Sequence, residues 1–176
     1  MGWTNAIEDI LQRYGGQGGA PGGANPAAAP ANPHQDFQQV AQAAPPDLLS
    51  SGISQAFHSG QTPPFPEMLS NLFSHSDPNQ RAGVLNRLLG TLSAGGFSGL
   101  PGLGSLSSLF SGGKVTPDQA NQVSPAQVQQ IAEHAQRQNP SIVDEISGFY
   151  AQHPEIMKAA GALALTIAVQ HILKNR

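Results

Sequence analysis

Two short phrases between residues 116 and 130 place a hydroxyl and an amide at a fixed spacing. Thr116 precedes Gln119 by three residues, Ser124 precedes Gln127 by three, and a proline follows each hydroxyl residue. A hydroxyl beside an amide could belong to a reaction centre. The same spacing is a capping box, in which both side chains bond backbone N–H groups at a helix start. Proline favours the first helical position, so we predict two helix starts rather than a catalytic pair.

Six histidines are the candidate metal ligands and general bases, and no two of them share a helical spacing. They are His34, His58, His75, His134, His153 and His171. Zinc sites usually include at least one pair of ligands a few residues apart in sequence. The chain has no cysteine, which excludes disulfides, thiolate catalysis and thiolate metal ligands. We therefore predict no metal site and no cofactor.

Other catalytic signatures are incomplete. Asp144 and Glu145 are adjacent, so on a helix they point about 100° apart, whereas an acid–base pair needs converging carboxylates. The sequence GFSGL at 96–100 misses the nucleophile elbow G-x-S-x-G by one residue, and no strand is predicted before it. The glycine-rich stretches complete no phosphate-binding motif. We expect a protein that is not an enzyme; an enzyme or small-ligand carrier is the less favoured alternative.

The charge pattern argues against nucleic acid as a partner. Charged residues make up 11% of the 176 residues, against about 25% in a typical domain, and the net charge is −3. A surface that follows phosphates needs clustered Lys and Arg, and the eight basic residues are scattered. The N-terminus does not read as a signal peptide, so we predict a cytoplasmic location.

The first 33 residues predict a helix on a tether. Residues 1–14 carry an amphipathic helix whose apolar stripe is Trp3, Ile7, Ile10, Leu11 and Tyr14. Residues 15–33 are a Gly/Pro/Ala linker. A helix this short is not stable alone in water, so it must dock. It folds back on its own domain, docks on a neighbouring subunit, or lies on a membrane.

A helical subdomain and a second low-complexity tract follow. Residues 34–93 predict three or four amphipathic helices, one of them capped by Asp77 and Gln80 around Pro78. Residues 94–114 are rich in Gly, Leu and Ser, and a plain spacer does not need the apolar residues that recur there. The tract is either a loop packed on the core or a segment that buries itself against another chain. Its candidate interface residues are Phe97, Leu103, Leu106 and Phe110.

Residues 115–176 form the predicted C-terminal helical domain. X-Pro pairs predict helix starts at Pro117, Pro125, Pro140 and Pro154, because proline disfavours helical geometry in the residue before it. We expect the last helix to run from Pro154 to about Lys174. Its central part is apolar all round, which is typical of a helix buried on all sides in a core or in lipid. The central helix of a bundle is preferred over a membrane span.

Two stretches resemble an uncharacterised bacterial family, the YidB-like proteins. Residues 116–165 carry most of the resemblance, and residues 63–90 resemble the middle of its longer members. The residues that carry it are Ser124-Pro125, Gln127-Val128, Ser141-Ile142-Val143-Asp144, Phe149-Tyr150 and His153-Pro154. The resemblance implies a small multihelical bacterial protein. It implies no activity, because the family has no established chemistry.

Together these patterns predict an all-α bundle around a buried C-terminal helix, with two low-complexity tracts and a tethered N-terminal helix. The favoured function is that of a non-enzymatic structural or interaction protein that self-associates into an oligomer or filament. The N-terminal helix and the tracts would supply the contacts. The alternative is a membrane-associated protein that uses the N-terminal or the C-terminal apolar helix.

Overall fold

A computed structural model describes residue 10 and residues 32–92 and 112–175 of the chain. The regular secondary structure of the described residues is helical, with no strand among them, which confirms the all-α prediction. The helices are α2 (Pro33–Ala43), α3 (Pro46–His58), α4 (Phe65–His75), α5 (Pro78–Thr91), α7 (Pro117–Ala120), α8 (Pro125–Gln138), α9 (Ile142–Ala151), the 3₁₀ helix η1 (Pro154–Ala160) and α10 (Ala162–Lys174).

Local sequence explains where most of these helices begin. The helices α2, α3, α4, α5, α7 and α8 each carry a proline at their first or second position. The capping box of α8 is formed as predicted: the Gln127 amide N–H donates to Ser124 Oγ at 3.3 Å, and the Ser124 N–H donates to Gln127 Oε1 at 2.9 Å. The boxes at α5 and α7 are confirmed in the same way.

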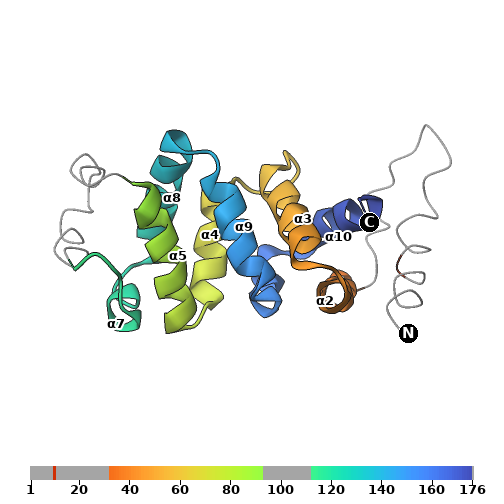
Figure 1. The fold of residues 1–176 in the computed structure, drawn as a ribbon, viewed down its shortest axis with the longest axis horizontal. Coiled ribbons are helices and arrows are strands. Elements are labelled where there is room, and N and C mark those ends of the chain that lie inside the picture. Colours follow the sequence, from red (N-terminus) through yellow and green to blue (C-terminus); the bar gives the residue numbers. More distant parts are fainter. Residues whose placement is uncertain (1–9, 11–31, 93–111, 176) are drawn as a thin grey trace.

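The helices lie side by side along the long axis of the molecule (Figure 1). At one end α5 packs on α7 and α8, and α4 packs on α8 and η1. In the middle α9 packs on α5 and on α3. At the other end α10 packs on α3 and α2. The second tract follows α5 and precedes α7, so it begins and ends at the α5–α7 end of the molecule. The helix α10 lies toward the opposite end (Figure 1).

One continuous apolar cluster joins the helices. Its largest fully buried members include Tyr150, Phe37, Phe65, Phe73, Met68 and Leu85. Ile10, which lies in the sequence before the linker, is also fully buried and belongs to this cluster. Burial of such side chains is the main term that stabilises a fold of this size, at about 1.5–3 kcal/mol for each.

The helices α3 and α10 approach each other closely at a glycine. A Cβ atom added to Gly52 would lie 2.6 Å from Ile172 Cγ1 and 2.8 Å from the Ala168 carbonyl oxygen. Ala164 and Ala168 of α10, which are four residues apart, are fully buried. These small side chains let α10 form a close helix pair inside the protein.

Two of the predicted helix starts in the C-terminal domain need correction. The helix expected at Pro140 begins at Ile142, because Pro140 and Ser141 lie in a turn in which the Ile142 N–H donates to the Asn139 carbonyl at 3.1 Å. Pro154 begins a 3₁₀ helix instead of an α-helix. The His153 side chain precedes this helix and makes no capping hydrogen bond.

The last helix is shorter than expected and is not buried on every side. Gly161, with φ of +87°, separates η1 from α10, a backbone conformation that favours glycine. Ala164, Leu165, Ala168 and Val169 are buried, whereas Leu163 is 50% exposed. The break lets η1 pack on α4 while α10 packs on α3. The helix α10 is therefore apolar on all sides of its central part but is not buried on all sides.

Candidate functional site

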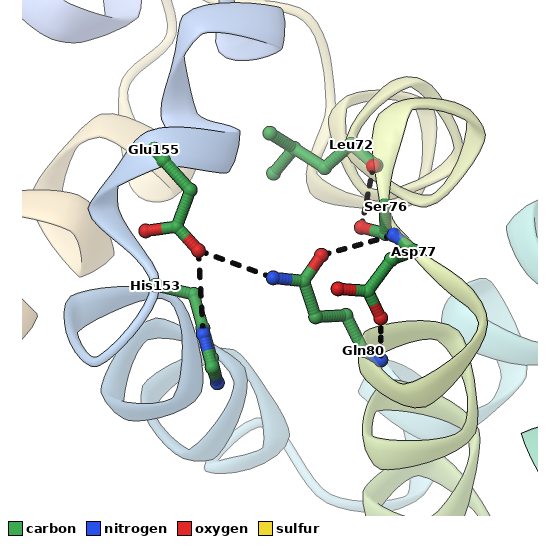
Figure 2. Close-up of polar contacts among 6 residues, drawn as sticks. All are labelled: Leu72, Ser76, Asp77, Gln80, His153 and Glu155. Atoms are coloured by element: carbon green, nitrogen blue, oxygen red, sulfur yellow. Dashed lines mark hydrogen bonds and ion pairs between the residues drawn. The ribbon is translucent and has the colours of Figure 1, made fainter.

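A chain of polar contacts joins the α4–α5 corner to the start of η1 (Figure 2). In the α5 capping box the Gln80 N–H donates to Asp77 Oδ1 at 2.9 Å, and the Asp77 N–H donates to Gln80 Oε1 at 3.0 Å. The other end of the same side chain, Gln80 Nε2, donates to Glu155 Oε1 at 3.1 Å. That carboxylate oxygen lies 3.4 Å from His153 Nδ1.

A carboxylate beside an imidazole is the pair that orients a general base in hydrolases. Here Glu155 is also tied to the capping glutamine, and its side chain is 58% exposed. The hydroxyl drawn in Figure 2 belongs to Ser76, which lies across Gln80 from the pair, is buried, and donates to the Leu72 carbonyl at 2.8 Å. A buried hydroxyl engaged with the backbone is not a nucleophile open to substrate. The contacts therefore fasten η1 to the α4–α5 corner.

Tyr150 on α9 places a phenol inside the core. Its hydroxyl is fully buried and has no hydrogen-bond partner of normal geometry among the described residues. Burial raises the pKa of Tyr150 well above its ordinary value, because a charged phenolate would lose its hydration there. The Ser76 hydroxyl acts in the opposite direction on this pKa and is the weaker influence. The phenol consequently stays neutral and cannot act as a base.

Arg87 of α5 and three ring side chains stack where α5 packs on α9. The Arg87 guanidinium carbon lies 4.6 Å from the centroid of the Phe149 ring. Phe149 contacts the Tyr150 ring edge-on at 5.4 Å and the His153 ring at 4.8 Å. A guanidinium over an aromatic face is worth about 0.5–1 kcal/mol when it is exposed to solvent. The stack holds α5 against α9 and packs Phe149 against His153, the histidine that contacts Glu155.

A serine and a histidine meet at the opposite end of the molecule, between α3 and α10. Ser51 Oγ lies 3.0 Å from His171 Nε2, and Asn175 Nδ2 lies 3.0 Å from the same nitrogen. The pair borders an open groove of about 400 Å³ lined by Gln55, Ile167, Gln170, His171, Lys174 and Asn175. A Ser–His contact next to a groove is the beginning of a nucleophilic site.

The rest of such a site is not assembled around His171. A catalytic histidine needs a third group that orients its second nitrogen, and no hydrogen bond or ion pair joins a carboxylate to His171 within residues 32–92 and 112–175. Asn175 also shares the nitrogen that would receive the serine proton. No group of three acidic or histidine side chains suited to a metal ion occurs in the described part of the chain.

Several contacts that position the helices were not visible in the sequence. Ser54 Oγ donates to Asp144 Oδ1 at 2.6 Å, so Asp144 links α9 to α3. The Asn86 side chain pairs with the backbone of Val115, accepting from its N–H at 2.7 Å and donating to its carbonyl at 3.1 Å. The partners lie far apart in the sequence, and no local pattern connects them.

The predicted interface residues fall almost entirely outside the described residues. Ile10 is described, and it is buried in the core cluster of its own chain. The remaining residues of that prediction lie outside the part of the chain that the structure describes; they are Trp3, Ile7, Leu11, Tyr14, Phe97, Leu103, Leu106 and Phe110.

One apolar area of the described surface faces solvent, at the junction of η1 and α10. It consists of Ala159, Ala160, Gly161, Ala162, Leu163 and Ile167, which are all partly or fully exposed; we call it the junction patch. Leu163 is the one large apolar side chain among the described residues that is clearly exposed. The patch borders the α3–α10 groove, because Ile167 belongs to both.

Comparisons with known proteins add no relative to these observations. No protein-family model, curated protein or solved structure matches the chain. The YidB-like resemblance therefore stays a prediction. None of the described helices combines the length and the apolarity that crossing a membrane requires.

Proposed function

We propose that the protein is a non-enzymatic structural or interaction protein that self-associates into an oligomer or filament. The contacts would come from the N-terminal helix, residues 1–14, and from the low-complexity tract, residues 94–114. The observation that carries the proposal is the recurrence of Phe and Leu in a tract whose other residues, before the final Lys114, are Gly, Ser, Pro and Ala. Apolar side chains at such a density usually mark a contact surface.

The polar groups of the described part support a role without catalysis. The contacts of Glu155, His153 and Gln80 fasten η1 to a helix corner, and the Ser51–His171 pair has no orienting carboxylate within the described ranges. These side chains hold the helices together, which is what a protein that presents surfaces to a partner requires.

Sedimentation velocity of the purified chain over a wide concentration range tests the proposal, with electron microscopy for any filaments. We expect the average mass to rise with concentration. A tract variant, with Phe97, Leu103, Leu106 and Phe110 changed to Ser, should shift the equilibrium toward monomer. A control with Gln129→Ser and Gln130→Ser, on the exposed side of α8, should behave like the natural chain. A chain that stays monomeric at every concentration refutes the proposal.

A second experiment on the purified chain distinguishes self-association from membrane binding. An N-terminal variant, with Trp3, Ile7 and Leu11 changed to Ser, leaves Ile10 intact because that side chain is buried in the core. Self-association predicts that this variant has a lower average mass than the natural chain and that neither floats with phosphatidylcholine–phosphatidylglycerol vesicles. Flotation of the natural chain, lost in the variant, favours the membrane alternative instead.

A further inference from the structure

We propose that the N-terminal helix, residues 1–14, docks on α2 of its own chain, with Ile10 in the apolar core and Arg13 paired with the carboxylate of Asp36. Two described side chains carry this inference. Ile10 is fully buried and belongs to the core cluster. Asp36 of α2 is 1% exposed and has a polar partner. The docking does not depend on the proposed self-association, because it is a contact within one chain.

Asp36 is the one charged side chain that is buried among the described residues. Burial removes the hydration of a carboxylate, so a buried Asp needs a cation or several hydrogen bonds. The first turn of α2 suits a negative charge, but Asp36 forms no cap there. No Lys, Arg or His of residues 32–92 and 112–175 forms an ion pair with it. The partner of Asp36 therefore comes from outside those ranges.

Arg13 and Arg176 are the two basic residues outside the described ranges. Arg13 follows Ile10 by three residues, so on a helix the two side chains point to the same side, about 60° apart. Fixing Ile10 in the core thus brings the Arg13 guanidinium to the same surface of the protein. Arg176 has no buried neighbour of this kind, since Lys174 and Asn175 before it are exposed.

The α2 helix offers the matching surface. Its buried side chains are Pro33, Asp36, Phe37 and Val40, which fall on one face. Phe37 and Val40 belong to the same apolar cluster as Ile10. The carboxylate of Asp36 therefore lies beside the apolar cluster that Ile10 enters, as an apolar anchor with a charged group three residues later requires.

The length of the tether favours α2 of the same chain over α2 of a second copy. Residues 15–32 separate the predicted helix from Pro33, the first residue of α2. A Gly-rich segment of about 18 residues has a root-mean-square length of about 21–25 Å, and a helix with its side chains is about 10–12 Å across. Such a tether supplies the helix at a millimolar effective concentration. A second copy in dilute solution competes poorly with that.

Docking in this orientation leaves part of the apolar stripe for another partner. Ile7 and Leu11 lie on the other side of Ile10 from Arg13, and Leu11 is about 100° away from Ile10 around the helix. The contacts between copies that the proposed function assigns to this helix can therefore use Ile7 and Leu11. Ile10 and Arg13 would meanwhile hold the helix on its own chain.

The test uses Trp3, the sole tryptophan of the chain. It precedes Ile10 by seven residues and so points within about 20° of it on a helix. Quenching of its fluorescence by acrylamide, compared with a synthetic peptide of residues 1–14, reports whether the helix is docked. We expect Trp3 to be protected in the full chain, and equally protected at every dilution, since the contact is within one chain.

Arg13→Gln and Asp36→Asn should each raise the ratio of undocked to docked helix by about a hundredfold or more, because a buried charge that loses its partner is strongly unfavourable. The quenching of Trp3 should then approach that of the peptide. Arg176→Gln and Asp47→Asn are the matched controls and should be quenched like the natural chain. Asp47 is an exposed carboxylate in the first turn of α3.

A double variant separates the ion pair from a general effect on the fold. Asp36→Asn should lower the urea midpoint of the natural chain but not that of Arg13→Gln, in which the pair is already lost. Equal losses in both backgrounds would show that Asp36 acts independently of Arg13 and would overturn the inference. Circular dichroism confirms that each variant is folded.

Three other results would also overturn the inference. Trp3 of the natural chain is quenched like the peptide, or Arg13→Gln leaves the quenching unchanged, or Arg176→Gln exposes Trp3 in its place. Protection that is lost on dilution shows docking on a second copy, which contradicts docking within one chain while it favours self-association. Protection that persists in a chain that sedimentation shows to be monomeric supports the inference even where the proposed self-association fails.

Discussion

The close approach of α3 and α10 makes a prediction about two glycines that lie in similar helices. Gly52 lies within α3, where an added Cβ would meet Ile172 Cγ1 at 2.6 Å and the Ala168 carbonyl at 2.8 Å. Gly90 lies in the last turn of α5, and an added Cβ would meet nothing within 4 Å. The same substitution to alanine should therefore have opposite effects at the two positions.

The magnitudes follow from two opposing terms. Alanine is a better helix former than glycine by about 1 kcal/mol, so Gly90→Ala should raise the free energy of unfolding by about 0.5–1 kcal/mol. At Gly52 the same gain meets an overpacking cost of about 1–3 kcal/mol. The clash involves a backbone carbonyl, which cannot turn aside as the end of a side chain can. We expect Gly52→Ala to lower the free energy of unfolding by about 1 kcal/mol.

Urea unfolding followed by far-ultraviolet circular dichroism measures both changes, with unchanged m values as the check on two-state behaviour. A third variant tests the cause. Ile172→Val removes the Cδ1 atom that would lie 2.9 Å from the new methyl group, so Gly52→Ala should cost less in that background. The reasoning fails if Gly52→Ala stabilises the protein as much as Gly90→Ala does.

Three further predictions concern single side chains: Tyr150, Asn86 and Ser124. Tyr150→Phe should raise stability by about 1 kcal/mol, because it removes a buried hydroxyl without a regular partner. Above pH 10.0, the ordinary pKa of a phenol, the unfolded chain loses the Tyr150 proton while the folded chain keeps it. Stability should then fall by about 1.4 kcal/mol per pH unit, and Tyr150→Phe should abolish that part of the slope in urea titrations; an identical slope in both proteins contradicts the assignment. Asn86→Ala should cost about 1–2 kcal/mol in the same assay through its two bonds to Val115, more than Asn86→Asp, which keeps the acceptor. Ser124→Ala should cost about 1 kcal/mol and Ser124→Thr much less; equal losses would show that the hydroxyl is not the cap.

The sequence predicted well those features that a short segment of the chain determines by itself. The capping boxes at Asp77, Thr116 and Ser124 involve residues three apart, so their geometry is set as soon as the helix forms. The amphipathic helices predicted within residues 34–93 are also present, and α4 among them buries one apolar face. Fold class follows from these local signals.

The features that the sequence missed depend on contacts between distant segments. The run from Pro154 to Lys174 contains good helix formers, and a single internal glycine is tolerated in a helix at a cost of about 1 kcal/mol. Gly161 nevertheless breaks the helix, because the two halves pack on different partners, η1 on α4 and α10 on α3. The Ser54–Asp144 and Asn86–Val115 contacts likewise exist only after the helices have assembled. The junction patch follows from the same break, since it exposes Leu163.

The clasp between Asn86 and Val115 has a consequence for how this protein can change. The clasp holds Val115, which follows the second tract, on α5, the helix that precedes the tract, so both ends of the tract are held on the helical scaffold. Doubling the length of a flexible loop adds only about 0.6 kcal/mol of closure entropy. Insertions or deletions between residues 93 and 111 should therefore be nearly free of cost to the scaffold. The length of the segment 93–111 can then change by insertion or deletion in the gene, with every helix left intact.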